Sequence, residues 1–170
     1  MDKKTLLTTI PGIAYHVAGT ALKKNLITTA VLGRLQIFYK DTGECIKETG
    51  ECILDLHVIP NGQRCPVKET TKRLNQRARR LATMPGGESG ITLSSDSDRK
   101  LGGAVQSEDL VFVYSSGGDA SAFADEAVLL VALTKARVLS KDTLALQGRL
   151  SAISPKYNEH LDQLLRACNW

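Results

Sequence analysis

Aromatic residues are scarce in this sequence, and it contains no long hydrophobic run. Phe, Trp and Tyr make up 5% of the 170 residues. The longest apolar run, residues 127–133, is much shorter than the ~18 residues that a membrane-spanning helix needs. The N-terminal stretch is a poor secretory signal, because Pro11, His16 and four threonines interrupt its apolar residues. We therefore expect no transmembrane segment and a cytoplasmic location.

The motifs that usually mark an active site or a cofactor site are also missing. The glycine pairs at 86–87, 102–103 and 117–118 lack the spacing of phosphate-binding loops, so they indicate turns. Ser89 lies in a stretch that resembles a nucleophile elbow, but Ile91 occupies the place of the second glycine. The sequence therefore predicts no catalytic residue and no cofactor. The enzyme alternative requires a site assembled from residues that are distant in the chain, namely His16, His57 and Ser89.

Cysteine is infrequent, and its spacing does not favour a metal site. Cys45, Cys52 and Cys65 occur near His57, but no Cys-x-x-Cys pair is present to hold a tetrahedral zinc. We therefore predict no metal. All four cysteines are interpreted as reduced thiols of an intracellular protein.

A five-residue duplication surrounds two of these cysteines. Thr-Gly-Glu-Cys-Ile occurs at residues 42–46 and again at residues 49–53. A chain reversal between residues 48 and 49 makes Cys45 and Cys52 cross-strand neighbours, close enough to form a disulfide. A reversal between residues 49 and 50 places Cys52 opposite Lys47, and no disulfide forms. Both registers remain open.

Acidic pairs in the second half of the chain are interpreted without a catalytic role. Asp96 and Asp98 lie in a predicted loop, where solvation accounts for them. Asp125 and Glu126 lie near the start of a predicted helix, where a negative charge complements the helix dipole.

Hydrophobic periodicity, caps and turn residues predict a mixture of helices and short strands. Helices are expected at residues 11–24, 66–84 and 119–139, after Ser140, and from Pro155 to the end; strands are expected at residues 27–39, 52–59, 90–93 and 109–114. Within the predicted helix 119–139, the apolar run 127–133 could instead be a strand. Because the strands are central and do not alternate regularly with helices, we predict an α+β fold with a small central antiparallel or mixed sheet and helices at both ends. One globular domain is expected across residues 1–170, with a mobile loop at about 85–108.

Positive charge is concentrated in the first half of the chain. Residues 1–80 hold 14 Lys and Arg against 7 Asp and Glu, whereas residues 81–170 hold 8 against 11. Within the predicted helix 66–84, six cations and one acidic residue, Glu69, occur in thirteen positions. Arginine side chains recognise phosphate groups well, so this segment is the candidate surface for an anionic partner. Its cations, called the basic segment below, are Lys68, Lys72, Arg73, Arg77, Arg79 and Arg80.

The composition of the basic segment limits the contacts that it can make. No aromatic residue lies between its cations, so base stacking is not indicated, and contacts to nucleic acid would go to the phosphate backbone. Anionic lipid headgroups offer the same chemistry, so both partners fit. The alternative is a solvated helix face whose arginines pair with the acidic second half of the chain.

In size, charge and lack of catalytic motifs, the chain resembles the compact matrix proteins of plant-infecting rhabdoviruses. The Pro-Pro-x-Tyr motif of some animal rhabdovirus matrix proteins does not occur in it. The resemblance implies a non-enzymatic structural protein that links nucleocapsid RNA to an acidic membrane surface and associates with itself, in the virion and the host cytoplasm. The basic segment would then contact ribonucleoprotein or lipid.

A third hypothesis makes the chain a protein-interaction adaptor. The predicted C-terminal helix has an apolar stripe that could bind a partner if it were exposed, although burial of the stripe in the core explains it as well. The stripe consists of Tyr157, Leu161, Leu164 and Leu165.

Overall fold

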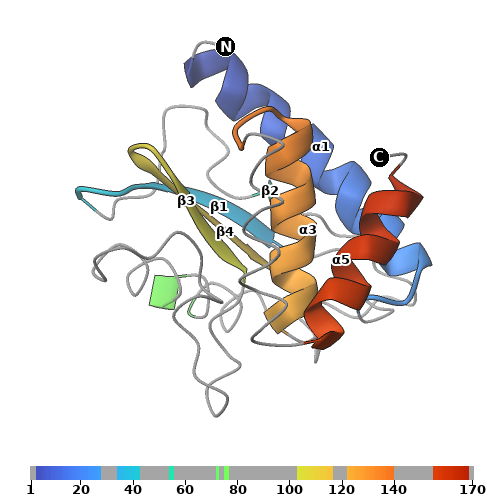
Figure 1. The fold of residues 1–170 in the computed structure, drawn as a ribbon. Helices are drawn as coiled ribbons and strands as arrows, with labels where there is room; N and C mark the ends of the chain where they lie inside the picture. Colours follow the sequence, from blue (N-terminus) through green and yellow to red (C-terminus); the bar gives the residue numbers. More distant parts are fainter. Residues whose placement is uncertain are drawn as a thin grey trace.

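The structure, a computed structural model, describes residues 3–27, 34–42, 54–55, 72, 75–76, 103–116, 122–139 and 155–168. Its elements are, in order, α1 (Lys3–Lys23), β1 (Arg34–Tyr39), β2 (Leu54–Asp55), β3 (Ala104–Ser107), β4 (Leu110–Ser115), α3 (Ala122–Lys135) and α5 (Pro155–Ala167). Figure 1 shows the strands next to a group of helices that come from both ends of the chain. The predicted α+β class is confirmed.

The strands form one sheet in the order β2-β1-β4-β3. β1 pairs with β4 over its full length, from Arg34 opposite Ser115 to Tyr39 opposite Leu110. β3 and β4 form a hairpin in which Ser107 is opposite Leu110. All the described pairings are antiparallel, so the described strands form the antiparallel alternative of the two sheet types that the sequence allows.

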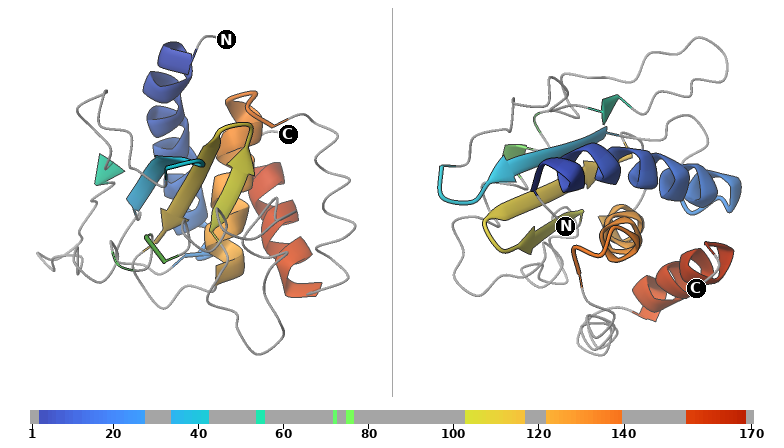
Figure 2. Two further views of the ribbon diagram at one scale, coloured as in Figure 1. Left: turned by 90° about the vertical axis from the view of Figure 1, so that its left-hand side faces the viewer. Right: turned by 90° about the horizontal axis from the view of Figure 1, so that it is seen from above.

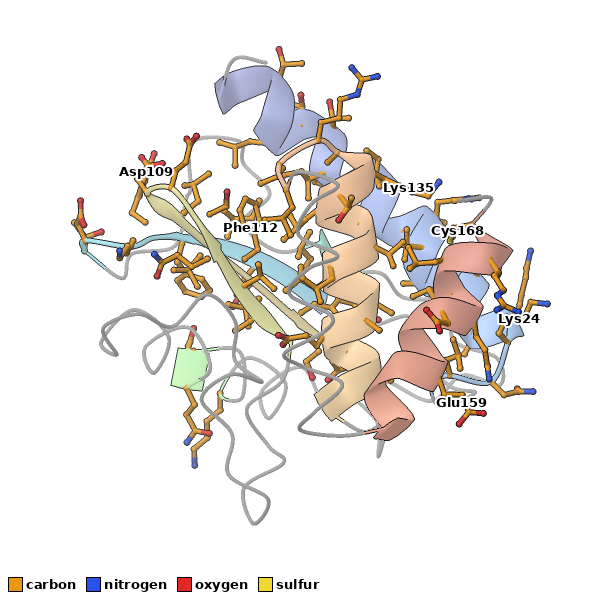
Figure 3. All side chains as sticks on the ribbon, viewed as in Figure 1. Lys24, Asp109, Phe112, Lys135, Glu159 and Cys168 are labelled. Carbon is orange, nitrogen blue, oxygen red and sulfur yellow. The ribbon has the colours of Figure 1, made fainter. Side chains whose placement is uncertain are left out.

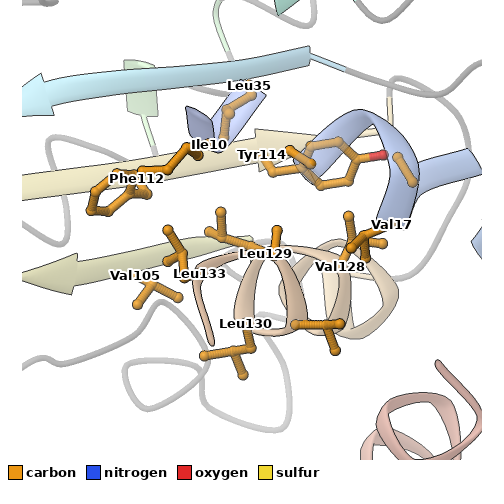
Figure 4. Close-up of a cluster of buried hydrophobic side chains, with 14 of the residues drawn as sticks. Ile10, Val17, Leu35, Val105, Phe112, Tyr114, Val128, Leu129, Leu130 and Leu133 are labelled. Atoms are coloured by element: carbon orange, nitrogen blue, oxygen red, sulfur yellow. The ribbon is translucent and has the colours of Figure 1, made fainter. Parts of the chain in front are cut away.

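The helices α1, α3 and α5 lie on one side of this sheet (Figure 2). Because side chains alternate along a strand, Leu35 and Ile37 of β1 share a face with Phe112 and Tyr114 of β4. All four belong to the same buried cluster as residues of the helices. Figure 4 shows Leu129 and Leu133 of α3 facing the strand that carries Phe112 and Tyr114.

α3 is buried along most of its length. Every residue from Ala124 to Leu133 is buried, because β3 and β4 pack on one side of the helix while α1 and α5 pack on others. A helix that is apolar on all sides fits such a position. The run 127–133 is therefore helical, as predicted for residues 119–139, and the strand alternative is wrong.

α1 begins well before the predicted start at residue 11. The helix runs through Pro11, which has no N–H group to donate to the carbonyl oxygen of Leu7. A proline inside a helix costs about 3 kcal/mol. Leu7 and Ile10 precede it and are buried in the core, and burial of such side chains contributes about 1.5–3 kcal/mol each. The prediction is wrong about this boundary because core packing outweighs the lost hydrogen bond.

Both α1 and α3 end with a left-handed residue other than glycine. Asn25 follows α1 with a φ of 57°, and Arg137 follows α3 with a φ of 60°. In each case the next backbone N–H donates back into the helix at 2.9 Å, from Leu26 to the carbonyl oxygen of Ala21 and from Val138 to that of Leu133. This is the hydrogen bond of a Schellman motif.

Two other predicted boundaries differ from the structure. Ile27, the first residue of the predicted strand 27–39, lies in the bend after α1, where it is buried against the helices. β3 occupies the end of the loop predicted at about 85–108, because Ala104 and Val105 are buried and pair with β4. By contrast, β4 and the start of α5 at Pro155 agree closely with the sequence.

Several predictions fall on residues that the structure does not describe. They are the strand 90–93, the helix after Ser140, the earlier part of the predicted loop and both registers of Cys45 and Cys52.

Candidate functional site

The structure describes three positions of the predicted helix 66–84. Lys72, Asn75 and Gln76 all have helical backbone. Lys72 and Gln76 are exposed and lie about one helical turn apart, whereas Asn75 is half-buried. Lys72 is therefore accessible to a partner. The other members of the basic segment lie outside the described residues: Lys68, Arg73, Arg77, Arg79 and Arg80.

Exposed cations also occur at the end of α1. Lys23 and Lys24 are both exposed, and no acidic residue occurs between Lys3 and Lys23. Figure 3 shows Lys24 and Asp109 at opposite ends of the described part of the molecule. The sequence alone does not mark these lysines as a binding surface, because two basic residues at a helix end are explained by the helix dipole. The absence of acidic residues over the whole helix is the signal that distinguishes α1.

Two carboxylates are buried near the start of α3. Asp125 and Glu126 are 2% and 0% exposed. The Glu126 carboxylate accepts hydrogen bonds from the backbone N–H groups of Gly103 and Ala104, the latter at 3.2 Å. The Asp125 carboxylate accepts one from the backbone N–H of Ser116 at 3.0 Å. This pair connects the first turns of α3 to the start of β3 and the end of β4.

The contacts of these carboxylates assign them a structural role. Both are closed off from solvent, and the bonds described above go to backbone N–H groups that need an acceptor when buried. Within the described ranges, no three His, Cys, Asp or Glu side chains come together in a way that could hold a metal ion. The described part of the chain therefore brings together no set of metal ligands.

A tyrosine lies close to the same carboxylates. Burial raises the pKa of the Tyr114 phenol well above its ordinary value, and the negative charge of Asp125 raises it further. Tyr114 is fully buried and points toward the helices (Figure 4). A buried phenol with a raised pKa stays protonated at neutral pH, so it contributes packing to the core rather than a base.

Of the residues named for the enzyme alternative, the structure describes only His16. Its side chain is exposed on α1. His57 and Ser89 lie outside the described residues, so their convergence with His16 stays a prediction.

The apolar stripe of α5 is buried where its side chains are described. Leu164 is fully buried in the same cluster as α1 and α3, and Leu165 packs partly against it. The side chains of Tyr157 and Leu161 lie outside the described residues. The described half of the stripe thus supports docking of α5 on the core, which was the alternative to the adaptor hypothesis.

In the ranges that the structure covers, none of the helices has both the length and the apolar character needed to cross a membrane. Comparison with known proteins gives no match to this chain among family models, curated proteins or solved structures.

Proposed function

We propose that this chain is a non-enzymatic assembly protein that binds an anionic partner through its basic segment. One observation carries the proposal: six cations and a single acidic residue occur between positions 68 and 80. Like charges at helical spacing repel one another, so a partner that neutralises them stabilises the segment. Lys72, the one member that the structure describes, is exposed and on helical backbone.

The chemistry of the segment defines the class of partner. Four of its six cations are arginines, whose planar guanidinium groups make paired hydrogen bonds to phosphate oxygens. Phosphate occurs both in nucleocapsid RNA and in an acidic membrane surface. The resemblance to rhabdovirus matrix proteins favours a protein that contacts such partners in the cytoplasm and in the virion, and that associates with itself.

Charge reversal in the basic segment tests the proposal. The triple variant Arg73→Glu/Arg77→Glu/Arg80→Glu is compared with the unmodified chain at low salt, using a fluorescent single-stranded RNA and vesicles that contain phosphatidylserine. We expect binding to fall below detection, because three attractive charges become repulsive. The matched control Lys40→Glu/Arg137→Glu/Arg166→Glu changes the net charge equally outside the segment and should retain most of the affinity.

Circular dichroism tests whether both variants are folded. Equal binding by the segment variant and the unmodified chain would contradict the proposal, as would an unmodified chain that binds neither RNA nor acidic vesicles.

A further inference from the structure

α1 has an exposed side with two lysines at its C-terminal end. The helix has 21 residues and is therefore about 30 Å long. Its buried side, which includes Ile10, Ala14 and Val17, packs against the core. Its opposite side, called the α1 outer face below, consists of exposed residues: Thr8, Gly12, Tyr15, His16, Lys23 and the adjoining Lys24.

The charged residues of α1 and of the bend that follows it are all lysines. Residues 3–27 contain four lysines and no Asp or Glu. Lys3 and Lys4 begin the helix, and Lys23 and Lys24 are exposed at its end. A flat anionic surface would thus meet no carboxylate of α1 along the length of the helix. Each lysine close to an acidic membrane contributes about fivefold to binding.

The exposed side chains of α1 favour a lipid surface over RNA. Tyr15 is 48% exposed and is the one large hydrophobic residue exposed among the described residues. A tyrosine has an apolar ring and a polar hydroxyl, which suits the boundary between lipid headgroups and acyl chains. The helix contains lysine but no arginine, so it lacks the planar group that forms paired bonds to single phosphates. Next to Tyr15, a Cβ atom placed on Gly12 would meet nothing within 4 Å, so the surface there is open.

From this combination of charge, exposure and length, we propose that the α1 outer face lies on an acidic lipid bilayer, with Tyr15 in the headgroup region and Lys23 and Lys24 against anionic lipids. This inference rests on the proposed function, since it names the anionic partner as a membrane and adds a second contact to the basic segment.

Vesicle flotation of the full chain tests the inference. The vesicles contain either phosphatidylcholine alone or phosphatidylcholine with a quarter of phosphatidylserine. We expect flotation only with the acidic vesicles, a loss of about 30-fold for Lys23→Gln/Lys24→Gln, and a loss of about tenfold for Tyr15→Ser. The matched control Lys40→Gln/Arg137→Gln removes two positive charges outside this face and should bind as the unmodified chain does.

The outcomes separate this inference from the proposed function. If both α1 variants bind acidic vesicles as tightly as the unmodified chain, the inference is wrong while the basic segment remains a candidate. If the unmodified chain binds the single-stranded RNA but not the vesicles, the inference is also wrong and the proposed function stands with RNA as its partner. Binding to neither overturns both. All substituted positions are exposed or half-exposed, and circular dichroism shows whether the variants remain folded.

Discussion

At the scale of single residues, Glu126 supplies the acceptor for two buried backbone N–H groups, those of Gly103 and Ala104. A buried donor that loses its acceptor costs about 1–3 kcal/mol. We therefore expect Glu126→Ala to lower the free energy of unfolding by about 2–4 kcal/mol. Glu126→Gln retains one acceptor oxygen and should lose less. Urea titration followed by circular dichroism measures both changes.

The control for this prediction is an acidic residue on the surface. Glu159 is exposed on α5 and accepts a 3.3 Å bond from the side chain of Gln163. Its replacement by alanine should change stability by no more than about 0.5 kcal/mol. Equal stability of the two alanine variants would show that Glu126 does not hold β3 on α3.

Tyr114 should make the folded state less stable at alkaline pH. Its folded pKa is raised by burial and by the charge of Asp125, whereas in the unfolded chain the phenol ionises near its ordinary value of 10.0. The stability that the neutral phenol provides is therefore complete below about pH 10 and is lost as the pH rises further. We expect Tyr114→Phe to lose less stability than the unmodified chain between about pH 9 and about pH 11.

Urea midpoints at several pH values measure this difference. Tyr15→Phe removes a hydroxyl from an exposed ring and serves as the control. Parallel pH profiles for the unmodified chain and Tyr114→Phe would refute the prediction.

The local sequence anticipates the position of the buried acids but not their partners. Acidic residues are favoured near the N-terminus of a helix, so the sequence predicts that Asp125 and Glu126 lie near the start of α3. Glu126 bonds to residues that precede it by 22 and 23 positions. Such contacts depend on how β3 packs beside α3, and no spacing within the helix encodes that arrangement.

At the scale of elements, the end of α3 carries a correctable strain. Arg137 has a φ of 60°, a conformation that costs a residue with a Cβ atom about 1 kcal/mol relative to glycine. Arg137→Gly should therefore raise the free energy of unfolding by about 0.5–1 kcal/mol, reduced by the loss of a positive charge at the helix end. Asn25→Gly at the end of α1 should give a smaller gain, because asparagine tolerates this conformation.

Thermal unfolding of the two variants tests whether Arg137→Gly gains more stability than Asn25→Gly. A lower melting temperature for Arg137→Gly than for Asn25→Gly would contradict it.

Prediction of the elements succeeds where local signals and packing agree. The start of α5 at Pro155 and the strand β4 follow from residues that favour those structures in isolation. The start of α1 does not, because Pro11 is a helix breaker locally and only the buried Leu7 and Ile10 keep the helix continuous. The short β3 is missed because its four residues gain stability by pairing with β4, a contact that composition alone does not reveal.

At the scale of the whole molecule, binding by two cationic regions should depend steeply on salt. The screening length falls from about 10 Å at 0.1 M salt to about 3 Å at 1 M, so attraction between lysines and anionic lipids is largely lost. We expect affinity for phosphatidylserine vesicles to fall by at least about 100-fold over this range. Flotation at increasing sodium chloride measures it, and binding that persists at about 1 M salt would show that electrostatics does not drive it.

The candidate site was predictable from the sequence in its charge but not in its position. The density of cations in the basic segment follows directly from the order of the residues. The α1 outer face could be identified only from the structure, which shows which residues of α1 are buried and which are exposed. Which residues of α1 are exposed depends on how the helices pack on the sheet, and so does the burial of Leu164 in α5.

The pairing of β1 with β4 has a consequence for how the chain folds. Tyr39 pairs with Leu110 and Arg34 with Ser115, so the partners are 71 to 81 positions apart in the chain. The β3–β4 hairpin is local, whereas β1 can pair with β2 first and must wait for its longer pairing until β4 has left the ribosome. Until then, the hydrophobic face of β1 is available to chaperones or to other unfinished chains. Slow translation between residues 40 and 110 would therefore favour aggregation of nascent chains.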